Sequence, residues 1–230
     1  MNLPRAARRL ATALLMVTAP GAQADIHVVD DSGATVALAQ PARRIVSLAP
    51  HLTEQLYAIG AGDRIVGTTD HADHPPAARA IPRVARAHAI SVEGIAALQP
   101  DLIVTWGSGF PAETVEPLRR LGVPVFVNEP RTLADVTSSL QRLGALTGLD
   151  AAPAVARFNE RLQPLRTTYA AQPPVRVFYQ AWAAPLMTLT GRHVISEAIT
   201  LCGGRNVFAD AAGISPTISA EAVIAADPQL

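Results

Sequence analysis

The chain contains an internal repeat, and this feature constrains its fold more than any other. Residues 90–102 align with residues 218–230 without a gap and are identical at six positions, namely 90/218, 91/219, 93/221, 97/225, 100/228 and 102/230. Each copy is typical of a serine-capped helix with a glutamate in its first turn, followed by a proline and an apolar residue that begins a strand. A looser match relates residues 54–66 to 197–208 in the same order, as helix, glycine turn and strand. The repeat therefore predicts two related lobes.

Short apolar runs alternate with amphipathic stretches along most of the chain. Five runs predict strands, and they lie at 45–48, 65–67, 102–106, 123–127 and 175–180, after an expected hairpin at 26–38. Helices are expected after Pro50 with a cap at Thr53, after Ser91, and from Pro111 to Gly122. This alternation predicts a mostly parallel sheet with helices on both faces.

Two consecutive helical stretches, at 132–146 and after Gly148, interrupt the alternation. We interpret the longer one as a rigid spine between the lobes. The predicted fold class is α/β, with two Rossmann-like lobes joined by a long spine helix. The expected divisions are a signal peptide at 1–24, a first lobe at 25–130, a helical pair at 131–172 and a second lobe at 173–230. Because the second repeat copy ends where its strand should begin, we expect this second lobe to be incomplete.

The first 24 residues have the pattern of an export signal. Three arginines precede an apolar stretch at 10–19, and small residues at 21–24 predict cleavage after Ala24 and a periplasmic location. No cysteine lies near that position, so no lipid anchor is expected there. Removing the three arginines leaves 16 basic and 19 acidic side chains, a net charge of −3 that argues against nucleic acid as a partner. The single cysteine, Cys202, is either buried or lacks its disulfide partner in this chain.

Several short segments occur together in an order found in one family of transport proteins. They are Arg44–Pro50, Thr53–Glu54, Gly67, 73–76, 98–103 and 201–208. With these segments the chain resembles the cluster III, helical-backbone substrate-binding proteins of ABC importers, which carry vitamin B12 (cobalamin), haem or ferric siderophores. The likeness is greatest to the members that bind cobalamin. The resemblance implies a monomeric binding protein with no enzymatic activity and no cofactor, which delivers a macrocyclic ligand to membrane permease subunits.

The resemblance also implies that each lobe presents one exposed glutamate to the permease. The matching positions are Glu93 and Glu221, the same pair that the internal repeat aligns. A glutamate in the first turn also favours the helix dipole, so the two explanations are compatible.

Ligands of open α/β folds bind at the carboxyl ends of the strands. The expected ligand-binding set combines residues near these predicted ends with positions that the resemblance adds. Its members are Pro50, His51, His71, His88, Trp106, Gly107, Ser108, Trp182, Met187 and Ser215. Flat apolar macrocycles bind well to aromatic platforms, for which Trp106 is the first candidate and Trp182 the second.

The identity of the ligand stays open at this point. Cobalamin is the first choice, and haem is an alternative because four side chains could serve as axial ligands, namely His51, His71, His88 and Tyr179. A ferric siderophore would require cationic residues, and no arginine cluster marks the strand ends. A bare transition metal bound at residues 70–74 is a weaker alternative, because their spacing matches no closed metal motif.

Overall fold

The structure is a computed structural model that describes residues 25–86, 89–110 and 112–230. Its largest sheet has six strands in the order β6-β5-β4-β3-β7-β8. Their bounds are β3 Ile45–Ser47, β4 Ile65–Thr69, β5 Arg83–Arg86, β6 Ala89–Ile90, β7 Leu102–Trp106 and β8 Val125–Asn128. All neighbouring strands are parallel except β5 and β6, which are antiparallel. The predicted parallel sheet is confirmed.

Two apolar clusters cover the two faces of this sheet. One face packs on α1 (Pro50–Ala58), on α4 (Leu133–Thr147) and on the hairpin of β1 (Ile26–Val29) and β2 (Thr35–Leu38). The other face packs on α2 (Val92–Ala97) and α3 (Ala112–Arg119). Two short 3₁₀ helices, η1 (Gly62–Arg64) and η2 (Pro76–Ala80), connect the strands. The strands are buried because both faces are covered, which explains their nearly continuous apolar sequences.

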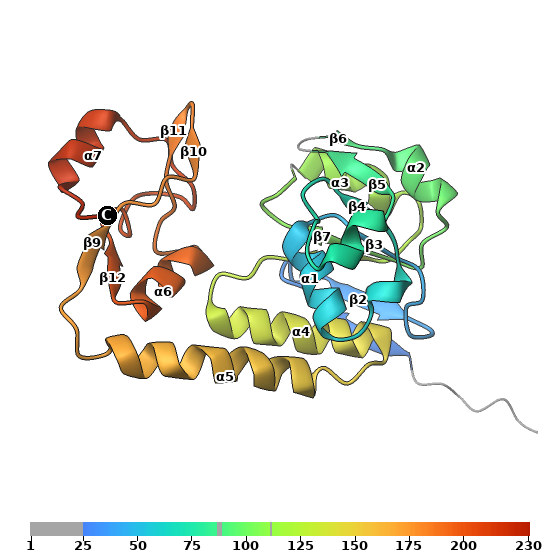
Figure 1. Cartoon of the computed structure of the whole chain (residues 1–230). Coiled ribbons are helices and arrows are strands. Elements are labelled where there is room, and N and C mark those ends of the chain that lie inside the picture. Colours follow the sequence, from blue (N-terminus) through green and yellow to red (C-terminus); the bar gives the residue numbers. More distant parts are fainter. Residues whose placement is uncertain (1–24, 87–88, 111) are drawn as a thin grey trace, which may run out of the picture.

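Two consecutive helices lie side by side, the first beneath the first lobe and the second extending from there beneath the second lobe (Figure 1). Helix α4 begins with a capping box in which Thr132 and Asp135 exchange hydrogen bonds, and it ends at Gly148 in a left-handed conformation. Helix α5 (Ala152–Tyr169) then runs back along α4 and contacts α6 (Val194–Leu201) at its far end. The expected spine helix is therefore present.

The second lobe contains β9 (Val175–Val177), β10 (Trp182–Ala183), β11 (Leu186–Met187), α6, β12 (Gly204–Asn206) and α7 (Ala220–Ala226). Strands β9 and β12 are parallel, and the amide of Phe178 donates to the carbonyl of Leu230 at 2.7 Å on the other side of β9. The order β12, β9 and Leu230 thus corresponds to β4, β3 and β7 of the first lobe. The internal repeat therefore corresponds to a structural repeat.

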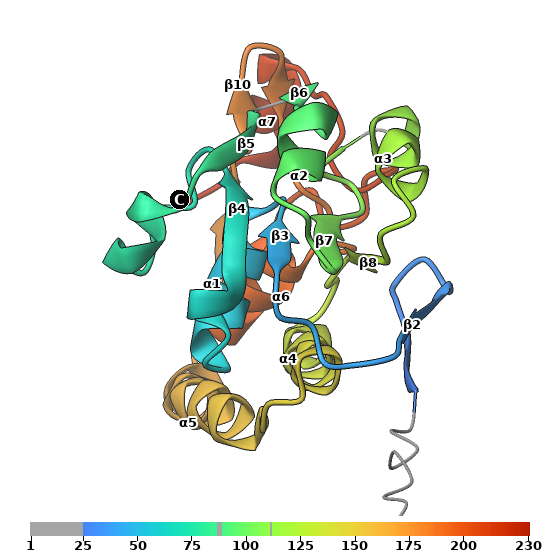
Figure 2. The ribbon, with the colours of Figure 1, turned by 90° about the vertical axis from the view of Figure 1, so that its right-hand side faces the viewer.

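Helices α2 and α7 show the same correspondence at the level of single side chains. Ser91 Oγ accepts a hydrogen bond from the amide of Gly94 at 3.1 Å, and Ser219 Oγ accepts one from the amide of Ala222 at 3.2 Å. Both helices lie at the end of their lobe that is remote from α4 and α5, as two perpendicular views show (Figures 1 and 2). Across the described ranges, none of the helices combines the length and apolar character that a membrane crossing requires.

Three local expectations were wrong. Helix α1 begins at Pro50, whose fixed φ suits the first turn, whereas Thr53 is buried inside the helix and contacts Ser47 Oγ at 2.9 Å. Strand β9 ends at Val177 instead of residue 180. Cys202 is exposed, so the buried alternative for this residue does not hold.

Candidate functional site

The carboxyl ends of β3, β7 and β8 bring an aromatic ring and a histidine together. Trp106 ends β7, is half-buried, and is the Cα partner of Asn128 in β8. His51 lies in the first turn of α1, directly after β3, and its ring meets the Trp106 ring edge to face at 5.5 Å between centroids. Both residues were expected near the ligand, and the structure places them in contact.

Burial lowers the pKa of His51 below the value of a free histidine, while Asn128 opposes this shift and His193 of the second lobe adds to it. His51 Nε2 and Asn128 Oδ1 are both buried, and neither has a hydrogen-bond partner of acceptable geometry within the described part of the chain. The two side chains therefore lie close to each other without forming a hydrogen bond. Burial thus disfavours the protonated imidazole, whose Nε2 atom has no partner among the described residues.

The lowered pKa of His51 predicts that the free energy of unfolding depends on pH. Near pH 6.5 the unfolded chain takes up a proton that native His51 does not, so the free energy of unfolding falls as the pH drops through this region. His51→Gln removes this contribution, and its free energy of unfolding is expected to fall less than that of the wild type between about pH 7.5 and about pH 5.5. Urea unfolding at both pH values measures the difference, with the exposed His74→Gln variant as control. An equal fall in wild type and His51→Gln would contradict this description of His51.

A carboxylate beside Trp106 organises the loop that follows β7. Glu129 directly follows β8, and its carboxylate accepts hydrogen bonds from the amide of Ser108 at 2.6 Å and from Ser108 Oγ at 3.1 Å. A Cβ atom at Gly107 would lie 2.9 Å from Glu129 Oε2, so a side chain at that position would displace the carboxylate. Gly107 and Ser108 are exposed next to Trp106, where they were expected.

A second carboxylate, that of Asp31, binds the residues at the end of β8. Asp31, in the turn after β1, accepts hydrogen bonds from the Glu129 amide at 2.6 Å and from Asn128 Nδ2 at 3.2 Å. It also pairs with Arg142 of α4 at 2.7 Å. The β1–β2 hairpin and α4 therefore both help to fix the end of β8.

The second lobe approaches this region through the beginning of α6. His193 caps α6, with its Nδ1 atom accepting a hydrogen bond from the amide of Ile195 at 3.1 Å. Burial lowers the pKa of His193, and the charge of Glu129 in the first lobe partly opposes that shift. Glu129 thus acts on the pKa of His193, and His193 acts on that of His51, each as a smaller contribution than burial.

The three predicted ligand residues of the second lobe lie in and beside the β10–β11 hairpin. Trp182 and Met187 are Cα partners across this hairpin, and the Trp182 side chain is 64% exposed. Ser215 is exposed on a neighbouring segment, which is held by hydrogen bonds from the amides of Thr188 and Thr190 to Pro216 and Ile214. Tyr179 is half-buried, and its carbonyl accepts a hydrogen bond from Thr188 Oγ1 at 2.8 Å.

The other predicted residues of the first lobe differ in their relation to this group. Pro50 is half-buried beside His51, but His71 is exposed in a left-handed turn after β4. His88 lies outside the described residues, as does the predicted cleavage site after Ala24. In the bare-metal segment, Asp73 pairs with Arg83 at 3.1 Å, and the described residues contain no cluster of His, Cys, Asp and Glu suited to a metal ion.

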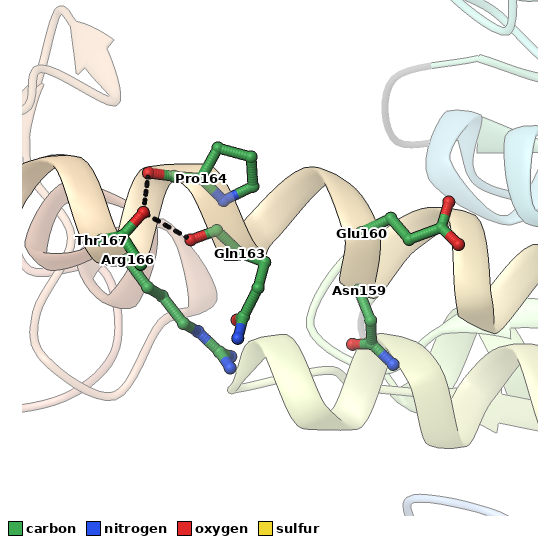
Figure 3. Close-up of a pocket in the computed structure, with 6 residues that line it drawn as sticks. All are labelled: Asn159, Glu160, Gln163, Pro164, Arg166 and Thr167. Carbon is green, nitrogen blue, oxygen red and sulfur yellow. Dashed lines mark hydrogen bonds between the residues drawn. The ribbon is translucent and has the colours of Figure 1, made fainter.

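Two open grooves lie elsewhere on the surface. One, of about 770 Å³, runs along α5 past Asn159, Gln163 and Arg166 (Figure 3). The other, of about 510 Å³, lies between the end of α5 and α6, and Tyr169 and Glu197 contribute to it. Neither groove contains a predicted ligand residue. Both grooves are open to solvent and lie apart from the strand ends that carry Trp106 and His51.

Glu93 and Glu221 occupy equivalent positions, each exposed in the first turn of its helix. The pKa of Glu221 is lowered by hydrogen bonding of its carboxylate to its own backbone amide and to the hydroxyl of Ser219. Its ionised form is therefore favoured at neutral pH.

Sequence reasoning did not identify Asn128, Glu129 or His193. Asn128 and Glu129 lie at the end of a predicted strand, so the rule that selected Trp106 could have found them. His193 lies immediately before an apolar helical run, where a cap is expected, but nothing in the sequence indicates that this helix faces the first lobe.

Two α/β lobes on a common helical support, with Trp106 and His51 at the strand ends of the first lobe, are typical of a binding protein for a small ligand. The family model described as "Periplasmic binding protein" matches residues 45–230. The vitamin B12-binding protein of Vibrio cholerae is 41% identical over 195 residues, covering 83% of this chain and 70% of that protein. The chain belongs to the periplasmic binding protein family and is a binding protein, not an enzyme.

Solved structures agree with this assignment. The crystal structure of the periplasmic vitamin B12 binding protein of Vibrio cholerae has a TM-score of 0.74 at 40% identity, covering 83% of this chain and 75% of that chain. A periplasmic heme binding protein from Pseudomonas aeruginosa has a TM-score of 0.71 at 26% identity, with coverages of 81% and 70%. The two-lobed α/β fold predicted from the repeat is thus confirmed.

Proposed function

We propose that this protein captures a corrinoid, vitamin B12, in the periplasm and delivers it to the permease of an ABC importer. The observation that carries the proposal is the Trp106–His51 pair at the carboxyl ends of β7 and β3, with its rings 5.5 Å apart. A half-buried indole offers a flat apolar surface of the kind that a corrin or porphyrin ring requires. The 41% identity to a vitamin B12-binding protein supports the corrinoid over the other macrocycles.

Ligand contacts are assigned to residues of both lobes. In the first lobe they are Pro50, His51, His71, His88, Trp106, Gly107 and Ser108, and in the second lobe Trp182, Met187 and Ser215. The same proposal includes the division of the chain into a first lobe at 25–130, a helical pair at 131–172 and a second lobe at 173–230. It also includes export with cleavage after Ala24.

Haem is the second candidate, because the heme binding protein of Pseudomonas aeruginosa has the same fold. Its iron would require an axial ligand, for which His51, His71, His88 and Tyr179 remain the candidates. Burial disfavours protonation of His51, and its Nε2 atom has no hydrogen-bond partner among the described residues, which suits a metal ligand.

The experiment that separates these ligands is equilibrium dialysis of the mature protein against equal concentrations of cyanocobalamin, hemin, a ferric siderophore and zinc. Absorbance spectra and metal analysis then identify what the protein retains. We expect retention of cyanocobalamin. Retention of hemin with a shifted Soret band, and no retained cobalamin, would replace the corrinoid with haem, and zinc alone would favour the bare-metal alternative.

Delivery to the permease is assigned to Glu93 and Glu221. Both are exposed at the ends of the lobes that lie away from the spine, where one flat partner could contact both (Figure 1). Carboxylates presented in this way fit a permease surface that carries arginines at matching positions.

A further inference from the structure

Two arginines, one in each lobe, hold the C-terminal ends of α2 and α7. The Arg44 guanidinium donates to the carbonyl of Leu98 at 2.6 Å and 3.1 Å and to that of Gln99 at 3.1 Å. In the second lobe, Arg176 Nε donates to the carbonyl of Asp227 at 2.8 Å, and Arg176 Nη2 pairs with Asp227 Oδ2 at 2.6 Å. Each arginine therefore binds the turn that ends the helix carrying Glu93 or Glu221.

The turns that these arginines bind have the same unusual backbone. Gln99 and Asp227, which the internal repeat aligns, are both non-glycine residues in the left-handed region, with φ of 47° and 45°. This conformation is unfavourable for a residue with a Cβ atom and requires support from its surroundings. The arginine donors supply that support in both lobes.

The backbones of the two arginines are anchored in the same way. The Arg44 amide donates to Asp101 Oδ1 at 2.9 Å, and the Asp101 amide donates back to the Arg44 carbonyl at 2.9 Å. The Arg176 amide donates to Gln229 Oε1 at 3.0 Å, and the Gln229 amide donates back to the Arg176 carbonyl at 2.8 Å. Arg44 and Arg176 lie outside the repeated segment of the sequence, so this equivalence emerges only in the folded chain.

Both helices depend on their ends because they are short and poorly buried. Helix α2 has six residues, and its buried residue is Ile95, whereas none of the seven residues of α7 is buried. Isolated helices of this length are unstable in water. A serine cap at the N-terminus and a cation at the C-terminus, where the helix dipole favours positive charge, are then the main restraints on the direction of the glutamate.

We propose that Arg44 and Arg176 are positioning residues of the permease-docking surface. Each fixes the helix that presents Glu93 or Glu221, and neither contacts the permease or the ligand itself. This proposal rests on the docking role of the two glutamates.

The test compares Arg176→Gln, Arg176→Lys and Arg44→Gln in the full-length mature protein. Stimulation of the ATPase of the cognate permease, reconstituted in nanodiscs, gives a half-saturating concentration and a maximal rate for each variant. We expect Arg176→Gln to raise the half-saturating concentration about tenfold, equivalent to 1.4 kcal/mol, with the maximal rate unchanged. Arg44→Gln is expected to raise it by a similar factor, and Arg176→Lys only about threefold because a cation remains.

Matched controls remove a neighbouring arginine of the same lobe. Arg43 and Arg205 are exposed, and within the described residues their side chains make no hydrogen bond or ion pair. Arg43→Gln and Arg205→Gln are expected to behave like the wild type. Hydrogen exchange provides an independent readout, because the α7 amides at 223–226 are expected to lose protection in Arg176→Gln and recover part of it in Arg176→Lys.

The outcomes separate this proposal from the one on which it rests. If Glu221→Gln weakens the interaction with the permease and Arg176→Gln does not, Arg176 has no positioning role and the docking role stands. If neither Glu93→Gln nor Glu221→Gln weakens the interaction with the permease, the docking role itself fails. A cyanocobalamin affinity that falls with Arg176→Gln as much as the permease interaction would also overturn the proposal, because the arginine would then stabilise the whole lobe.

Discussion

Replacing Trp106 with alanine is expected to weaken cyanocobalamin binding by about 100-fold, equivalent to 2.7 kcal/mol. The Trp106 ring is half-buried at the end of β7 and is held in place by the His51 ring. Because its indole is partly open to solvent and already fixed in position, Trp106 can stack on a flat ligand with little loss of side-chain entropy on binding. Isothermal titration calorimetry measures the change in the dissociation constant.

Two matched variants make the Trp106 result interpretable. Trp106→Phe keeps a flat ring and is expected to lose less than about tenfold, while Trp182→Ala, at a 64% exposed position, should also lose less than Trp106→Ala. Thermal unfolding of each variant checks that the fold is retained. Wild-type affinity in a folded Trp106→Ala protein would remove Trp106 from the ligand site.

The second large effect concerns delivery. Reversing the charge at both docking positions, with Glu93→Lys and Glu221→Lys, is expected to reduce permease-dependent uptake of cyanocobalamin by about 100-fold or more, because like charges then oppose each other at both contacts. Affinity for cyanocobalamin is expected to stay at the wild-type value, since both glutamates are exposed and belong to helices at the outer ends of the lobes.

The control for the charge reversal is Glu116→Lys, an exposed glutamate of α3 in the first lobe, which is expected to leave uptake unchanged. Uptake into proteoliposomes that contain the permease, with radiolabelled cyanocobalamin, gives the rates. A double variant that loses ligand affinity instead of uptake would place one of the glutamates in the ligand site.

Much of the fold follows from the sequence because its signals are local. Strand β7 has the predicted bounds of 102–106, and the Ser91 and Ser219 caps are where the repeat places them. The chain continues in the same direction between parallel strands, so residues after consecutive strands reach one edge of the sheet. That rule brings Pro50, His51 and Trp106 together without any knowledge of the tertiary structure.

The residues that support the site could not be predicted in the same way. The bond from the Glu129 amide to Asp31 joins residues 98 positions apart, and the pairing of Arg142 with Asp31 depends on how α4 packs against the hairpin. Proximity of His193 to Glu129 requires the two lobes to be placed on the spine first. Thr53 has the sequence of a cap, yet a proline at the start of α1 moves the N-cap four residues earlier, to Ala49.

Calorimetric titration of the mature protein with cyanocobalamin tests the central claim most directly. The two-lobed site with its tryptophan platform predicts one molecule bound per chain, with a dissociation constant of about 1 µM or lower. A folded protein, verified by circular dichroism, that produces no heat of binding with cyanocobalamin at about 100 times that concentration would contradict the claim.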